Sequence, residues 1–192
     1  MTNKHTKKQA KGLKYQTNRN KLTCSVMGVE NSGAGSVAVP EKHRLRKVTR
    51  IDDKAFADSP FREITLPDSV TEIGNRAFHG CKNLLEIRLG NSVRSIGIGA
   101  FQGCENLYSV TLPSTVTVIG TDAFADCANL RSIVIPDSVE GMENSVFSGC
   151  EKLSRILFTG TKRQWEKVYP YSTKKLFRSA CTVECTDGSV EF

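Results

Sequence analysis

The chain has 192 residues, enough for one ordinary domain, and no run approaches the ~18 apolar residues of a membrane-spanning helix. Hydrophobic residues make up 39% and charged residues 24%, so the composition excludes a disordered or fibrous protein. The net charge of +7 is unevenly placed: of the 27 Lys and Arg residues seven precede Glu30, whereas none of the 20 Asp and Glu residues does.

Residues 1–21 are predicted to form a basic, flexible leader, because they are polar and lack acids. They contain no apolar core of a secretory signal, so the residues alone leave the location open between the cytoplasm and the cell exterior. A segment of this kind could bind nucleic acid or another anionic surface by charge alone. This binding activity is the first alternative to the function inferred below.

Residues 22–54 are predicted to form an N-terminal cap and an irregular first coil. Leu22, Cys24 and Val26 alternate with polar residues, as in a half-buried strand. A turn-rich stretch then leads to residues 37–39, so we predict that the two segments pair as a capping hairpin.

Residues 55–160 repeat one pattern every 23 residues. The repeat is marked by columns of cysteine, phenylalanine and leucine: Cys81, Cys104, Cys127 and Cys150; Phe78, Phe101, Phe124 and Phe147; and Leu84, Leu107, Leu130 and Leu153. A fixed period of 20–29 residues that carries leucines indicates a leucine-rich repeat solenoid. We call each repeat a coil. Coils of this kind bury their apolar edges only by stacking on one another.

Each coil is predicted to begin with a short Ile-x-Leu strand, and Pro67, Pro113 and Pro136 end three of these strands. A second apolar stretch, ending in glycine in three coils, returns the chain, and an Ala-Phe pair follows in a short helical turn. The predicted fold class is therefore a repeat solenoid. It has a short parallel β-sheet on one face, short helical turns and loops on the other, and a cap at both ends.

Residues 161–192 are predicted to form the C-terminal cap. Thr161 and Gln164 have the spacing of a capping box, so a short helix is expected over about 161–168. Trp165, the single tryptophan, is expected to cover the open end of the core. The alternation of Cys181, Val183 and their neighbours predicts a final strand.

The repeat units LPDSVTEIGNRAFHGCKNL and LPSTVTVIGTDAFADCANL resemble the BspA-type leucine-rich repeat of bacterial surface antigens. The terminal FTGTKRQWEKV, followed by CTDG, is similar to the cap of that family, so the resemblance covers roughly residues 22–192. It implies a non-enzymatic module that binds a protein partner, with an adhesin-like role at a bacterial surface. An intracellular scaffold is a further alternative, because no signal peptide is visible.

Side chains that flank the inward residues of the predicted strands point away from the core and form a candidate partner-binding strip. The strip consists of Glu63, Thr65, Glu86, Arg88, Ser109, Thr111, Ser132, Val134, Arg155 and Leu157. It is neither basic nor aromatic, unlike a nucleic-acid platform. Five strands at ~4.8 Å give a sheet only ~24 Å wide, so we expect a monomer with modest affinity or one that binds through avidity.

No set of residues indicates catalysis, a metal or a cofactor. The three histidines are scattered, no CxxC pair appears, and no glycine-rich phosphate loop follows a strand. We call Cys81, Cys104, Cys127 and Cys150 the ladder cysteines. Those in adjacent coils are close enough for a disulfide, but their apolar flanks favour free, buried and unreactive thiols.

Two basic clusters lie outside the strip and are interpreted as solvated cap surface. They consist of Lys42, Arg44, Arg46, Lys47 and Arg50 near the N-terminus, and of Lys162, Arg163, Lys167, Lys174, Lys175 and Arg178 near the C-terminus.

Overall fold

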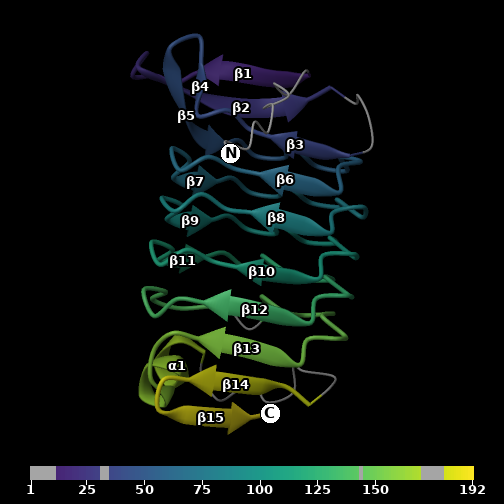
Figure 1. The fold of residues 1–192 in the computed structure, drawn as a ribbon, viewed down its shortest axis with the longest axis vertical. Helices are drawn as coiled ribbons and strands as arrows, with labels where there is room; N and C mark the ends of the chain where they lie inside the picture. Colours follow the sequence, from purple (N-terminus) through teal and green to yellow (C-terminus); the bar gives the residue numbers. More distant parts are fainter. Residues whose placement is uncertain (1–11, 31–34, 143–144, 170–179) are drawn as a thin grey trace, which may run out of the picture.

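The computed structural model describes residues 12–30, 35–142, 145–169 and 180–192, which stack as successive coils along one axis (Figure 1). One continuous core of buried side chains runs from the first coil to the last. In chain order the elements are β1 (Leu13–Thr17), β2 (Thr23–Val29), β3 (Ser36–Ala38), β4 (Lys42–His43), β5 (Arg46–Ile51), β6 (Glu63–Thr65), β7 (Glu72–Ile73), β8 (Glu86–Arg88), β9 (Ser95–Ile96), β10 (Ser109–Thr111), β11 (Val118–Ile119), β12 (Ser132–Ile135), β13 (Arg155–Phe158), α1 (Lys162–Val168), β14 (Thr182–Cys185) and β15 (Gly188–Glu191).

The first face of the solenoid carries the predicted parallel strands, and the predicted fold class is confirmed. Strands β3, β6 and β8 form one sheet, and β10, β12, β13, β14 and β15 form a second. The inward residue of each strand lies beside its equivalent in the next coil, as Ile64 beside Ile87 and Ile133 beside Ile156. The two faces of each strand therefore differ as the period of two requires, with one side chain buried between exposed neighbours.

The second face is also a sheet, which the sequence analysis described only as a returning apolar stretch. Strands β2, β5, β7, β9 and β11 pair in parallel, and β1 and β4 pair antiparallel with β2 and β5. Strands β7, β9 and β11 have only two residues each, so their alternation is too short to be recognised as a strand pattern.

The Ala-Phe segments form the third side, called the turn side, where consecutive turns replace a regular helix. Local bonds close each turn, such as Gln102 N–H to Gly99 C=O at 3.0 Å. Intervening amides donate to the next coil instead, such as Phe101 N–H to Ala123 C=O at 2.8 Å. The phenylalanines stack beneath this ladder with ring centroids 5.0–6.1 Å apart. Hydrogen bonds and aromatic contacts thus tie every coil to its neighbour on this side.

Gly74, Gly97 and Gly120 are needed because neighbouring coils approach closely. None of the three has a positive φ, so a left-handed backbone is not the reason for glycine here. A Cβ atom on Gly97 would lie 2.7 Å from the backbone nitrogen of Asn75, and one on Gly120 would lie 2.7 Å from that of Ile98. The glycine column therefore sets how tightly the coils stack.

The N-terminal cap differs from the prediction. Strand β2 pairs antiparallel with β1 and parallel with β5, whereas β3 joins the first face beside β6. The predicted hairpin between residues 22–26 and 37–39 is wrong, because Val37 matches the repeat and pairs with Ile64 of the next coil. Leu22 is 77% exposed rather than half-buried. The hairpin partner, β1, lies within the segment assigned to the leader, of which residues 1–11 lie outside the described residues.

The C-terminal cap is built as predicted. Helix α1 begins with a capping box in which Thr161 and Gln164 exchange hydrogen bonds. Trp165 is buried and packs against Phe158 and Tyr169, with ring centroids 5.4 and 5.3 Å away, so it closes the end of the core. Strand β14 pairs in parallel with β13. After the predicted turn, β15 pairs antiparallel with β14.

We predict that Gly97→Ala lowers the free energy of unfolding by about 1–3 kcal/mol, because its Cβ would force neighbouring coils apart. Gly141→Ala is the matched control: no atom lies within 4 Å of its Cβ, so its effect should stay within about 0.5 kcal/mol. Urea denaturation followed by circular dichroism measures both. Equal stability of the two variants would contradict the role of the glycine column.

Candidate protein-binding surface

The strands of the first face bring the ten strip residues onto one surface. Eight of the side chains are exposed, and Ser132 and Val134 are half-buried. The sheets place the strip residues beside one another in two groups. Glu63 lies beside Glu86 in the first group, and Val134 lies beside Leu157 in the second. Whether the strip binds a partner remains a proposal.

The strip is interrupted between β8 and β10, which belong to separate sheets. In neighbouring coils a backbone bond crosses this position, from Leu66 N–H to Arg88 C=O and from Leu112 N–H to Val134 C=O. The equivalent bond from Leu89 to Thr111 is not formed. The backbone N–H of Leu89 and C=O of Thr111 therefore lack the partner that their equivalents have in other coils.

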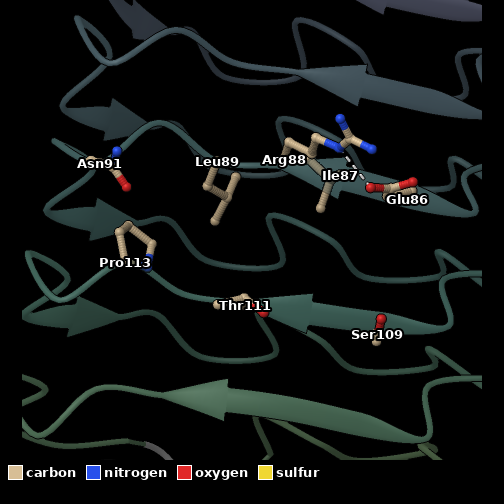
Figure 2. Close-up of a pocket in the computed structure, with 8 residues that line it drawn as sticks. All are labelled: Glu86, Ile87, Arg88, Leu89, Asn91, Ser109, Thr111 and Pro113. Carbon is tan, nitrogen blue, oxygen red and sulfur yellow. Dashed lines mark hydrogen bonds and ion pairs between the residues drawn. The ribbon is translucent and has the colours of Figure 1, made fainter.

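A groove of about 320 Å³ occupies this interruption (Figure 2). Its lining consists of Glu86, Ile87, Arg88, Leu89, Asn91, Ser109, Thr111 and Pro113. Leu89 is half-buried here, whereas its equivalents Leu66 and Leu112 are each 3% exposed. The groove thus combines an apolar floor with polar and charged rims.

Gly90 is the sequence feature that accompanies the groove. It occupies the position after the strand where Pro67, Pro113 and Pro136 stand in other coils. A Cβ atom on Gly90 would lie 2.1 Å from the carbonyl oxygen of Pro67, so the chain here lies tightly against the preceding coil. This close contact with the preceding coil accompanies the missing hydrogen bond between Leu89 and the following coil. In the sequence, the glycine in place of proline is the feature that marks this coil as different.

Ion pairs neutralise much of the strip. Arg88 Nε lies 2.7 Å from Glu86 Oε1, and the hydrogen bond to Glu86 raises the pKa of Arg88. Arg155 binds Glu184 with two hydrogen bonds of 2.7 Å, which lower the pKa of Glu184. Sequence analysis missed Glu184 as part of this surface, although the alternation around Val183 pointed to it. The face is consequently of mixed charge, unlike a nucleic-acid platform.

A second hollow, of about 480 Å³, lies on the second face near the C-terminal cap. Ile98 and Val118 line it and are 52% and 51% exposed, and Met142 and Val168 extend its apolar lining. The repeat pattern predicts no role for this surface. Both exposed residues stand where other coils carry polar side chains, such as Asn75 for Ile98, and that substitution was the available signal.

The four ladder cysteines are free and buried. Each thiol donates to a phenylalanine carbonyl of the preceding coil, with Sγ–O distances of 3.0–3.2 Å. The sequence predicts free, buried thiols at these positions, but not these hydrogen bonds. Ser59 occupies the same position in the first coil and contacts Cys81 Sγ at 3.3 Å. A hydroxyl thus replaces the thiol there.

Electrostatics disfavours thiolates in the middle of the ladder. The hydrogen bond with Cys81 and burial raise the pKa of Cys104, and the hydrogen bond with Cys150 and burial raise that of Cys127. Burial also raises the pKa of Cys181 to about 12. Since the thiolate is the reactive form, these groups are poorly suited to nucleophilic chemistry.

Within residues 12–30, 35–142, 145–169 and 180–192, no three His, Cys, Asp or Glu side chains are grouped so as to hold a metal ion. No helix in that part of the chain is long and apolar enough to cross a membrane. Of the predicted C-terminal basic cluster, Lys174, Lys175 and Arg178 lie outside the described residues.

A solenoid of short parallel strands with leucines in every coil defines a leucine-rich repeat protein. A family model of the BspA type leucine rich repeat region matches residues 46–175, with six copies of the repeat. The chain belongs to this family, and the resemblance drawn from its sequence is confirmed. Proteins of the class are generally binding modules rather than enzymes. No curated protein matches the chain.

Solved structures agree with the assignment. A Treponema pallidum leucine-rich repeat protein is 29% identical, with a TM-score of 0.70, and the match covers 77% of this chain and 69% of that one. A leucine-rich cell surface protein of Faecalibacterium prausnitzii is 30% identical, with a TM-score of 0.73 and coverage of 80% and 40%. A Bacteroides ovatus leucine-rich repeat protein is 30% identical, with a TM-score of 0.58 and coverage of 76% and 45%. The chain spans less than half the length of the last two.

We predict that a small thiol reagent at pH 8 modifies Cys185 first and the ladder cysteines only after unfolding. Cys185 is the one half-buried cysteine, whereas the other six are buried and out of reach of the reagent. Burial decides the order, because the pKa of Cys185 is itself raised by burial and the hydrogen bond with Cys104 lowers the pKa of Cys81. Mass spectrometry of native and urea-unfolded protein measures the modified sites. Cys185→Ser should remove the early modification; rapid native labelling of all four ladder thiols would refute the prediction.

Proposed function

We propose that the protein is a non-enzymatic, adhesin-like interaction module that acts at or near a bacterial surface and binds a protein partner through the strip. The groove between β8 and β10 is the observation that carries this proposal. It lies within the exposed strip, and its lining residues Leu89 and Thr111 lack the backbone hydrogen bond between coils that their equivalents form. Backbone groups that lack such a bond can bind an extended segment of a partner.

The groove has the size and chemistry of an anchor site. Its volume of about 320 Å³ is at the small end of the range for ligand pockets, so it suits a side chain or two of a partner. Leu89 supplies apolar contact, and the rim residues Arg88 and Thr111 supply charged and hydroxyl groups. Interfaces of this design derive most of their energy from a few anchors that fill central pockets.

The surface location draws its support from relatives. The Faecalibacterium prausnitzii protein of similar structure is a cell surface protein. This chain covers 40% of that protein, so its location is carried over here only as part of the proposal. A small strip would give modest affinity per molecule, which suits attachment through many copies on one cell.

The double variant Arg88→Glu with Val134→Asp is predicted to weaken partner binding at least tenfold, a loss of about 1.4 kcal/mol, because it alters both halves of the strip. The full chain is tested by biolayer interferometry against purified extracellular-matrix and plasma proteins. The strip variant is then compared on each protein that binds. Thr111→Arg, at an exposed position on the groove rim, should weaken binding similarly without a buried charge.

The matched control is Arg94→Glu with Val118→Asp, which makes the same changes at exposed residues of the second face. It should bind as the unaltered protein does, and thermal unfolding verifies that all variants are folded. Unchanged binding of both Arg88→Glu with Val134→Asp and Thr111→Arg would refute the role of the strip. A loss in the control alone would assign binding to the second face.

A further inference from the structure

The N-terminal cap contains a projecting hairpin that the repeat does not require. Residues 41–47 are inserted relative to other coils, and β4 and β5 pair antiparallel around a turn at Arg44 and Leu45. The hairpin extends past β1 at the N-terminal end of the stack (Figure 1). Both turn residues have positive φ, 46° and 67°, a conformation that usually selects glycine or asparagine. Leu45 at the tip is 98% exposed.

The hairpin is held in place by the cap. The His43 ring stacks on Tyr15 of β1, with centroids 3.8 Å apart and planes 11° from parallel. Arg46 Nε donates to Lys21 C=O at 3.0 Å, and Val48 N–H donates to Glu41 C=O at 2.9 Å. The fold therefore presents the exposed tip on an anchored support.

The charges on the hairpin repel one another. Lys42 lies directly opposite Lys47 in the β4–β5 register, a placement that disfavours the isolated hairpin. In the part of the chain that the structure describes, neither lysine nor Arg44 forms an ion pair. Arg50, by contrast, pairs with Asp52, Asp53 and Glu72. An anionic partner would relieve the repulsion at the hairpin.

A second exposed leucine accompanies the first. Leu22, 77% exposed, lies in the turn between β1 and β2 next to Lys21, whose carbonyl accepts the Arg46 hydrogen bond. The register of β2 and β5 places Thr23 beside Lys47. The same surface thus combines unpaired cations with exposed aliphatic side chains.

We propose that this hairpin surface docks on an anionic lipid bilayer, with Leu45 inserted among the acyl chains and Lys42, Arg44 and Lys47 against the headgroup phosphates. Peripheral membrane binding of this kind combines apolar insertion with attraction of cations to anionic lipid. Nucleic acid is a poorer fit, because its binding uses stacking rings and base contacts, whereas the tip here is aliphatic. In sequence, Lys4, Lys7, Lys8 and Lys11 add charge of the same sign before β1.

The experiment is cosedimentation of the full chain with vesicles. One set contains phosphatidylcholine alone, and the other contains phosphatidylcholine with about one quarter phosphatidylserine. The protein should sediment with the anionic vesicles and stay in solution with the neutral ones. Leu45→Ser should weaken partitioning about tenfold, and Lys42→Gln with Lys47→Gln should weaken it tenfold or more.

The matched controls make the same kinds of substitution at exposed positions far from the hairpin. Leu85→Ser removes an exposed leucine from the repeat body, and Lys152→Gln with Lys167→Gln removes two charges near the other end. Both should bind as the unaltered chain does. In Leu45→Trp, the emission of the added tryptophan should shift to shorter wavelength with anionic vesicles; Trp165 is buried and serves as an internal constant.

Three outcomes overturn the proposal. Equal partitioning of Leu45→Ser and Leu85→Ser would exclude insertion. An equal loss of vesicle binding in the two double lysine variants would show that binding depends on net charge alone and not on the hairpin. Release of the protein from vesicles by a short oligonucleotide, with Leu45→Ser binding that oligonucleotide unchanged, would assign the surface to nucleic acid.

Discussion

Contact between equivalent residues in neighbouring coils is the interaction on which the whole structure depends. Each inward side chain packs on its own counterpart one repeat away, as the stacked phenylalanines do at centroid distances near 5 Å. The backbone ladder of the turn side and the thiol–carbonyl bonds have the same repeat-to-repeat geometry. All of these contacts need coils of nearly equal length. The constraint explains why cysteine, glycine and phenylalanine recur as faithfully as leucine.

The same constraint determines what could be predicted from the sequence. The period alone identified β6, β8, β10, β12 and β13 of the first face and the buried columns, because the pattern of one coil recurs four or five times along the sequence. The C-terminal cap was equally readable, since Thr161 and Gln164 form a local motif. The repeat pattern does not extend to the N-terminal residues that form β1, so it does not predict that strand. The alternation of Leu13, Tyr15 and Thr17 within a basic stretch was the signal for β1, and the charge of that stretch concealed it.

The candidate surface was predictable in membership but not in shape. Alternation placed Glu63 through Leu157 on the outside, and eight of the ten side chains are exposed there. The groove, by contrast, lies where Leu89 and Thr111 do not form the backbone hydrogen bond of other coils, which alternation within one strand does not predict. Thiol hydrogen bonding and the pairing of Arg155 with Glu184 likewise depend on residues more than 20 positions apart. Interactions between columns are thus harder to infer than the columns themselves. The uneven charge is visible in the sequence, but the position of Lys42, Arg44 and Lys47 on a projecting hairpin is visible only in the structure.

The interruption between β8 and β10 also affects mechanics. At that junction the turn side is still tied, since Phe78 stacks on Phe101 and Gly80 N–H donates to Gln102 C=O. The second face is tied as well, because β9 and β11 pair in parallel across the same junction. At this junction the first face therefore has fewer backbone hydrogen bonds between coils than the other two sides, with one from Tyr108 N–H to Leu85 C=O at 3.4 Å. A bend that opened the solenoid at this junction would break fewer hydrogen bonds on the first face than elsewhere, and the same bend would widen the groove.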